Sequence, residues 1–201
     1  MALINESAYR QAEAVGGESR PRMGAGGYVC QIQAVRTHGE DSYHRPINYV
    51  KDRQYVVMIF DVAEGEHAGR FSDEYFASQD KDYAHRFYLS WKNVETDERM
   101  MGMLKSKMQA FDESNGGFDA FAALNAEQWT HFVGKYIGLV FGEEEYIAND
   151  GSVKTRLRFP YIKSVQDIRD GRYRVPALKK IDVSAPSTVA AETETYSDVP
   201  F

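Results

Sequence analysis

The sequence predicts a mainly β domain with a helical insertion between its third and fourth strands. Five stretches are typical of strands, because their apolar residues either alternate with polar ones or form short runs. After the third strand, apolar residues instead recur at helical spacing. Hydrophobic residues make up 43% of the 201 residues, which is enough for the core of one domain with extensions.

Two strands are predicted before the first clear turn. Residues 28–33 alternate in the manner of a strand with one buried face. Residues 54–63 contain a run that is apolar on both faces, which predicts a central strand. The residues between them, 37–53, have no clean periodicity, so we expect a long loop there.

A third strand is predicted after a turn at residues 64–70. We expect it to include Phe71 and Tyr75-Phe76, to be interrupted near residues 79–80, and to resume over residues 85–90.

Two helices are predicted next. Asp97 is typical of an N-cap, and residues 98–111 follow it with apolar residues at helical spacing, so this Met-rich face is expected in the core. We expect a shorter helix after Asn125, ending at Gly134. The residues expected to be buried in the two helices are Met100, Met101, Leu104, Met108, Phe111, Trp129, Phe132 and Val133.

The last two strands form a predicted hairpin. They cover residues 136–146 and 153–165, and residues 149–152 between them contain a glycine that supplies the positive φ of a tight turn. Three strands, a helical insertion and a hairpin follow the order of an OB-like five-stranded barrel, whose hairpin loops commonly bind oligonucleotides. A β-sandwich ranks second, because it would need more turns and no long helix.

Composition divides the chain into three parts. Residues 1–22 are polar and predict a flexible N-terminal arm, and residues 23–168 form the OB-like domain. Residues 169–201 are predicted to be a basic and then acidic tail that is disordered, since it has few core residues.

The formal charge of −6 hides an uneven distribution. No Lys or Arg follows Lys180, and the four acids beyond it leave 26 acidic and 24 basic residues in residues 1–181. A nucleic-acid surface needs a local basic patch rather than a basic total. The charge therefore leaves a nucleic-acid-binding function open.

One predicted strand carries a row of cations. Lys154, Arg156 and Arg158 alternate with Val153, Leu157 and Phe159, so the cations share one face and the apolar residues face the core. Such a row can face backbone phosphates. The alternative interpretation is a solvated face paired with Glu143, Glu144 and Glu145 on the neighbouring strand.

The predicted loop at 37–53 combines aromatic and basic residues. Aromatic rings stack on bases while cations hold the phosphate backbone, which suits single strands. Alternatively, Tyr43 and Tyr49 fold back onto the barrel. The candidate binding residues in this loop are Tyr43, Arg45, Tyr49, Lys51 and Arg53.

Little in the sequence indicates catalysis. The five histidines are scattered, and no pair has metal-ligand spacing. Asp61, Glu64 and Glu66 can be read as a nuclease-like metal site, but capping and solubilising a turn is the better interpretation. We therefore expect a binding protein rather than an enzyme, with no cofactor and no metal.

The C-terminal residues predict a partner-binding tip. Asp198, Val199, Pro200 and Phe201 place an aromatic ring beside the α-carboxylate after an acidic stretch. A basic-rimmed pocket can capture such a group. Pro200 lowers the entropy lost on binding.

These residues resemble the acidic tip of bacterial single-stranded-DNA-binding proteins, which end in Asp-Asp-Ile-Pro-Phe or close variants. The body resembles phage-encoded single-stranded-DNA-binding proteins associated with recombination. Gly27-Tyr28 and the six residues from Gly65 to Arg70 match that family's motifs. The resemblance implies an OB-like fold that binds single strands in phage replication or recombination.

We therefore expect sequence-tolerant binding of single-stranded DNA, with replication or recombination proteins and further copies of the chain as other partners. The alternative is a phage protein-interaction module that binds a host or phage enzyme and no DNA. A metal-dependent nuclease ranks third. Cys30 is the only cysteine and no apolar run approaches the length of a membrane helix, so a cytoplasmic location is expected.

Overall fold

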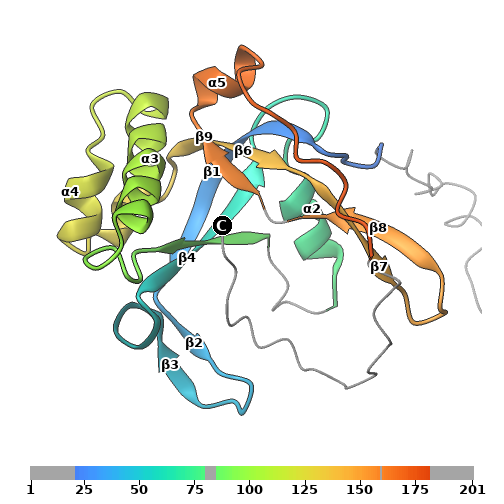
Figure 1. Cartoon of the computed structure of the whole chain (residues 1–201), viewed down its shortest axis with the longest axis horizontal. Helices are drawn as coiled ribbons and strands as arrows, with labels where there is room; N and C mark the ends of the chain where they lie inside the picture. The colour runs from blue at the N-terminus through green and yellow to red at the C-terminus, as the bar shows by residue number, and fades with distance from the viewer. Residues whose placement is uncertain (1–20, 80–84, 159, 182–201) are drawn as a thin grey trace, which may run out of the picture.

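The computed structural model describes residues 21–79, 85–158 and 160–181. These residues form a strongly curled antiparallel sheet, a half-barrel whose strands run in the order β5-β4-β1-β6-β9 (Figure 1). The structure thus confirms a mainly β domain. The five strands are β1 (Gly26–Arg36), β4 (Tyr55–Val62), β5 (Arg86–Ser90), β6 (Tyr136–Phe141) and β9 (Tyr161–Lys163).

The core lies on one face of this sheet. Side chains of a strand alternate between faces, so Val56, Met58 and Phe60 of β4 and Phe87 and Leu89 of β5 all point inward and are buried. The run that the sequence shows as apolar on both faces is central, because β4 lies between β1 and β5. The other face of the sheet carries Tyr55 of β4 and Tyr88 of β5.

Helix α3 (Glu98–Ser114) closes the inner face. Asp97 caps it as predicted, since its side chain accepts hydrogen bonds from the backbone N–H groups of Arg99 and Met100. Leu104, Met108 and Phe111 are buried as predicted, whereas Met101 is exposed. No helix in the described part of the chain is long and apolar enough to cross a membrane.

The prediction for the second helix is wrong in position. The helix α4 (Ala120–Asn125) is capped by Asp119, so Asn125 is its last residue rather than its cap. A short 3₁₀ helix, η2 (Trp129–Phe132), follows. Phe132 is buried as predicted, but Val133 is exposed. Along the chain, α3, α4 and η2 all lie between β5 and β6.

The first part of the predicted third strand is instead a helix, α2 (Arg70–Ala77). Asp61, at the end of β4, accepts hydrogen bonds from the backbone N–H groups of Phe71 and Ser72. This distant carboxylate satisfies the free donors of the first helical turn. The second part of the prediction is confirmed, since β5 covers Arg86–Ser90.

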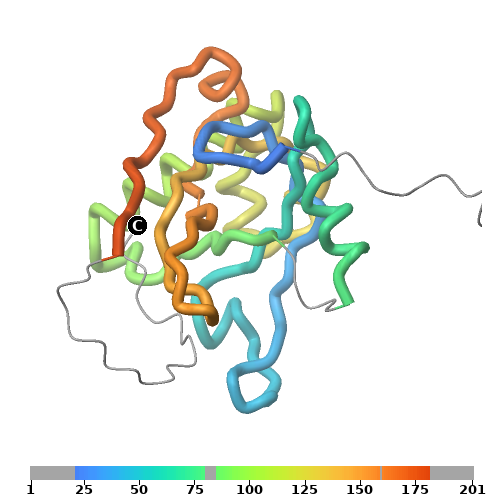
Figure 2. Tube along the Cα trace, turned by 90° about the vertical axis from the view of Figure 1, so that its right-hand side faces the viewer, coloured from blue at the N-terminus to red at the C-terminus, as the bar shows by residue number. Residues whose placement is uncertain are grey.

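The prediction of a loop without regular structure over residues 37–53 is also wrong. A small hairpin of β2 (His38–Glu40) and β3 (Pro46–Asn48) extends away from the sheet, and one turn of π-helix, η1 (Tyr49–Arg53), leads into β4 (Figure 2). Asn48 caps η1 by accepting a hydrogen bond from the Lys51 backbone N–H. Short-range turns and caps, rather than alternating hydrophobicity, order this segment.

The predicted C-terminal hairpin exists but bends. Its outer part pairs β7 (Glu143–Ile147) with β8 (Val153–Leu157), and its inner part pairs β6 with β9. Gly151 closes the turn with a φ of 77°. Two residues explain the interruption of the predicted long strands. Gly142 packs closely against Pro176, and Pro160 cannot donate a ladder hydrogen bond.

The folded body extends beyond the predicted boundary at residue 168. Helix α5 (Val165–Arg169) packs over β1 and β6, and the chain then descends to β7 (Figure 1). The Tyr161 hydroxyl donates a hydrogen bond to the Arg174 carbonyl and accepts one from the Arg174 backbone N–H. Residues 1–20 of the predicted arm and residues 182–201 of the predicted tail lie outside the described residues. Pro21 and Arg22 contact Arg70 and Thr155.

Gly138 allows α5 to pack against β6, and we expect Gly138→Ala to destabilise the fold. An added Cβ would lie 2.7 Å from the Ser164 carbonyl oxygen, closer than atoms pack without a backbone shift. Overpacking of this kind costs about 1–3 kcal/mol. Gly102→Ala is the matched control, because nothing lies within 4 Å of that Cβ on the α3 surface. Urea unfolding should show a lower free energy of unfolding for Gly138→Ala and no decrease for Gly102→Ala.

Candidate nucleic-acid interface

The structure places the predicted loop residues at two locations, the tip of the β2–β3 hairpin and the helix η1 that follows it. Tyr43 lies at the tip and is 77% exposed. The Arg45 guanidinium lies 5.2 Å from the Tyr43 ring centroid and forms a 2.7 Å ion pair with Asp41. The hairpin tip therefore presents an exposed ring with a cation held against it.

Asp41 organises this tip. Its carboxylate accepts hydrogen bonds from the Arg45 side chain and from the backbone N–H groups of Arg45 and Tyr43. These donors stabilise the ionised form and lower the pKa of Asp41 from its usual 3.8 to about 2. The tip thus keeps its charge pair throughout the neutral range.

Tyr49 folds back onto the sheet, as the alternative interpretation of the loop expects. Its ring stacks on Tyr55 with centroids 5.2 Å apart, and Tyr55 meets Tyr88 edge to face at 5.0 Å. We call these three residues the tyrosine cluster. A Cβ at Gly39 would overlap the Tyr49 hydroxyl, so the glycine lets the hairpin close over this ring. All three rings remain partly exposed.

Cations surround the tyrosine cluster on the outer face of β4 and β5. Val57 pairs with both Tyr88 and Arg36, which places those side chains in one row across the sheet. Arg86 pairs with Ile59 in the next row, and Arg53 lies at the end of η1. Arg36, Arg53 and Arg86 are exposed and form no ion pair with any described residue.

The electrostatics of Tyr55 reflect these neighbours. Burial raises the pKa of its hydroxyl above the usual value of 10.0, and Tyr88 and Tyr49 act in the same direction. Arg53 and Arg86 oppose the shift, because a nearby cation favours the phenolate. Tyr55 is therefore a neutral ring within the electrostatic reach of two arginines at neutral pH.

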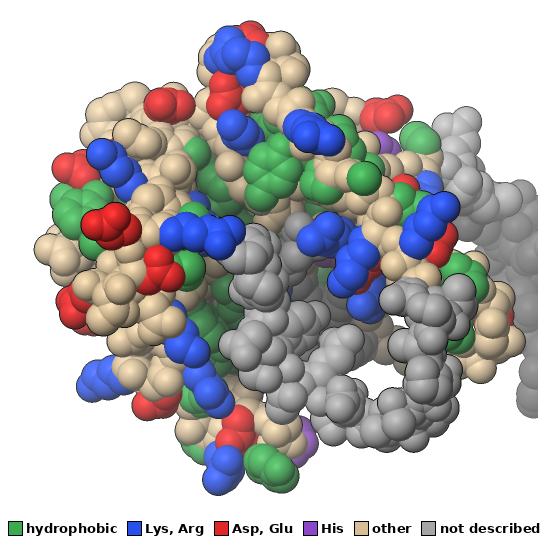
Figure 3. All heavy atoms as spheres, viewed as in Figure 1, with side chains coloured by type: hydrophobic (Ala, Val, Ile, Leu, Met, Phe, Trp, Pro, Cys, Tyr) green, Lys and Arg blue, Asp and Glu red, His purple; other side chains and the backbone are tan. Residues whose placement is uncertain are grey.

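The second group of predicted residues lies on the β7–β8 hairpin. Lys154 and Arg156 share the face that carries Tyr146, since Tyr146 pairs with Lys154 and Glu144 pairs with Arg156. We call this the hairpin face, and Arg158 continues its row just beyond β8. Lys and Arg side chains gather over β7 and β8 on the visible surface (Figure 3).

The hairpin face also bears carboxylates, as its alternative interpretation expects. Arg156 Nε lies 2.9 Å from Glu144 Oε1 and its guanidinium covers the Tyr146 ring at 5.4 Å. Lys154 lies 3.2 Å from Asp150. Arg158 has no ion pair among the described residues. Leu157 packs against the core as predicted, but Val153 is 59% exposed, and Phe159 lies outside the described residues.

Sequence reasoning misses the sheet part of the site: Tyr55, Tyr88, Arg36 and Arg86. The alternation of residues in β5 could have predicted two of them, Arg86 and Tyr88. Phe87 and Leu89 of β5 are buried and alternate with Arg86, Tyr88 and Ser90. Because side chains of a strand alternate between faces, this pattern predicts that Arg86, Tyr88 and Ser90 point outward. Tyr55 lies at the start of a run that is apolar on both faces, so its proximity to Tyr49 and Tyr88 depends on the tertiary structure.

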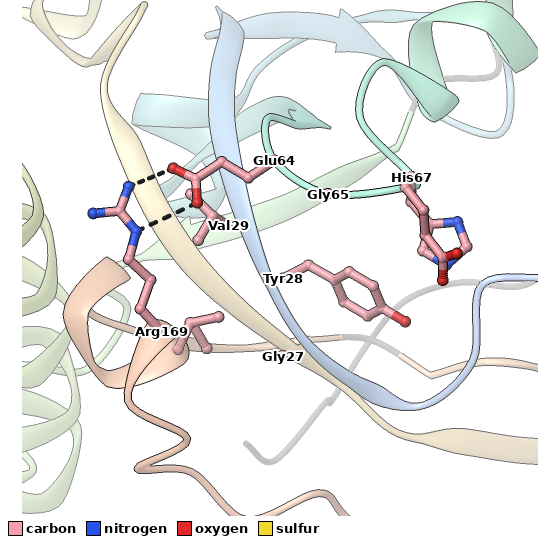
Figure 4. Close-up of a pocket in the computed structure, with 9 residues that line it drawn as sticks. Gly27, Tyr28, Val29, Glu64, Gly65, His67 and Arg169 are labelled. Atoms are coloured by element: carbon pink, nitrogen blue, oxygen red, sulfur yellow. Dashed lines mark hydrogen bonds and ion pairs between the residues drawn. The ribbon is translucent and has the colours of Figure 1, made fainter.

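The acidic residues near β4 stabilise a turn. Asp61 caps α2, and Glu64 forms an ion pair with Arg169 of α5; both residues line a pocket that Gly27 and Gly65 also line (Figure 4). His67 lines the same pocket, buried beside Tyr28. The described residues contain no group of His, Cys, Asp or Glu side chains arranged to hold a metal ion.

The predicted partner-binding residues Asp198 to Phe201 lie outside the described residues. Comparison of the sequence with protein-family models and with curated proteins gives no match. The tyrosine cluster and the hairpin face are therefore the features on which a function can rest.

Proposed function

We propose that this chain binds single-stranded DNA with little sequence preference, using the tyrosine cluster to stack bases and the surrounding cations to hold the backbone. One observation carries the proposal. Three partly exposed tyrosines from separate segments adjoin one another on a sheet face, with Arg36, Arg53 and Arg86 around them. Every base has a π-face, so such a surface binds single strands without reading their sequence.

The order of elements supports an OB-like architecture. Three sheet strands come first, then α3 and α4, then the strands of the bent hairpin. In OB folds, the face of the second and third strands and the loops of the first and last hairpins bind oligonucleotides. In this chain β4 and β5 are the second and third strands of the sheet, and they carry Tyr55 and Tyr88 of the tyrosine cluster.

The biological setting is proposed from the sequence resemblance. Its motifs favour phage replication or recombination in the cytoplasm of a host cell, with Asp198, Val199, Pro200 and Phe201 recruiting partner proteins. In the structure, the motif from Gly65 to Arg70 is the turn that starts α2. Its contribution is therefore structural, and DNA contacts are assigned to the tyrosine cluster and the two hairpins.

Titration of a fluorescently labelled oligo-dT over a series of salt concentrations tests the proposal. Binding should weaken as salt rises, with a slope of about −0.7 per phosphate contact. A duplex of the same length should bind more weakly, because its bases cannot stack on protein rings. Absence of binding to oligo-dT at low salt would contradict the proposed function.

A protein-interaction module that binds no DNA is the second candidate. One observation favours it: Arg45, Lys154 and Arg156 each already have a carboxylate partner. The same titration separates the two candidates, since only the first predicts binding to oligo-dT.

The C-terminal tip has its own test. Deletion of residues 193–201 should leave the domain folded and its affinity for oligo-dT equal or slightly higher, because acidic residues compete with phosphates for cations. Binding to a replication or recombination partner should be lost. Phe201→Ala should reproduce most of this loss, since one aromatic anchor often dominates a small interface. An added residue after Phe201 should also weaken binding.

A pull-down from host lysate measures these effects. The full-length protein, the truncated protein and Phe201→Ala are compared at equal concentration. Recovery of the same partners by all three would show that the tip does not recruit them.

A further inference from the structure

The chain beyond Arg174 returns to the outer edge of β7 and joins it at Lys179 through one isolated β-bridge. Lys179 forms a parallel bridge with Glu144: its N–H donates to the Glu143 carbonyl, and its carbonyl accepts from the Glu145 N–H. The Ile181 N–H donates to the Glu145 carboxylate. This segment occupies the edge of β7 opposite β8, so the hairpin face is wider than the hairpin itself.

The register places Lys179 on the hairpin face. Residues directly opposite one another in a sheet share a face. Glu144 is opposite Arg156 on one side and opposite Lys179 on the other, so the three side chains form one row across the strands. We expect Lys180, the next residue, on the other face, because successive side chains of an extended chain alternate.

The charges in this row suit a phosphate backbone that crosses the strands. Lys179 and Arg156 lie on both sides of Glu144, separated by two strand spacings of about 5 Å each. Lys179 is exposed and forms no ion pair with any described residue. Adding Lys179 gives the hairpin face a fourth cation beside Lys154, Arg156 and Arg158.

We propose that the segment bridged to β7 at Lys179 is part of the DNA-binding surface and that Lys179 binds a backbone phosphate. This inference rests on the proposed function and extends it to a segment that composition assigns to the tail. Asp182 follows directly on Ile181, and the other acidic residues of the tail are Glu192, Glu194 and Asp198. Detachment of the segment from β7 would therefore remove a phosphate contact, which links the position of the tail to DNA affinity.

Lys179→Gln and Lys180→Gln form a matched pair for testing this inference. Both remove one positive charge from adjacent exposed residues, and neither removes a backbone hydrogen bond. In the oligo-dT titration, Lys179→Gln should weaken binding severalfold and reduce the salt slope by about 0.7, the loss of one phosphate contact. Lys180→Gln should leave both quantities close to those of the unmodified protein.

A third variant tests the row itself. Glu144→Gln removes the carboxylate between Arg156 and Lys179, so it should raise affinity for oligo-dT. If the unmodified protein binds but the two lysine variants behave alike, or Glu144→Gln weakens binding at unchanged thermal stability, the inference is wrong while the proposed function stands. If the unmodified protein does not bind oligo-dT, both are wrong.

Discussion

Replacing Tyr55 and Tyr88 together with alanine is expected to cause the largest loss of affinity for single-stranded DNA. A base stacked on an aromatic side chain contributes about 1–3 kcal/mol, which is roughly five- to 150-fold in Kd for each base. Both rings belong to the tyrosine cluster, and both lie on the sheet face opposite the core. Fluorescence anisotropy with labelled oligo-dT measures the change.

Conservative variants separate stacking from structure. Tyr55→Phe and Tyr88→Phe keep the rings and should retain most of the affinity, since stacking does not need the hydroxyl. Phe121→Ala removes an exposed ring from α4 and should leave DNA binding unchanged. Thermal unfolding shows whether each variant remains folded. If the double alanine variant is folded and binds as tightly as the unmodified protein, the tyrosine cluster serves only to hold η1 against the sheet.

Reversing the charges of Arg156 and Arg158 is expected to have the second largest effect. Substituting both residues with glutamate should weaken binding to oligo-dT at least severalfold and reduce the salt slope, because two cations of the hairpin face become anions. Arg156 lies on the face away from Leu157, which packs against the core, and the two-residue period of a strand places Arg158 on the same side as Arg156. The domain should therefore remain folded.

Single variants sharpen this comparison. Arg156→Glu places two carboxylates opposite each other, since Glu144 pairs with residue 156, and this loosens the hairpin slightly. Arg158→Glu breaks no ion pair among the described residues, so its effect on binding is the cleaner measure. Lys105→Glu, on the exposed surface of α3, makes the same change in net charge and should have little effect. Equal losses for Arg158→Glu and Lys105→Glu would mean that net charge, not the hairpin face, controls binding.

Several elements are readable from the sequence because neighbouring residues determine them. Asp97 caps α3 through hydrogen bonds to residues two and three positions away, and apolar spacing alone then places Leu104, Met108 and Phe111 in the core. The turn that closes β7 and β8 depends on Gly151 and its positive φ. The alternation of side chains along a strand is equally local, and it predicts both the mainly β character and the row of Lys154, Arg156 and Arg158.

Other features depend on residues that meet only in the folded chain. Phe71 to Phe76 read as a strand by composition, but Asp61 supplies the cap that makes them a helix. The tyrosine cluster joins η1, β4 and β5, whose proximity no local pattern indicates.

Lys179 reaches the hairpin face by pairing with Glu144, 35 residues earlier in the chain. By itself, the sequence determines the central strand, the long helix, the turn chemistry and the row of cations, because each depends on the spacing of side chains along a short segment. Only the tertiary structure decides which rings stack together and which cations share a face, because strand pairing brings distant residues into one surface.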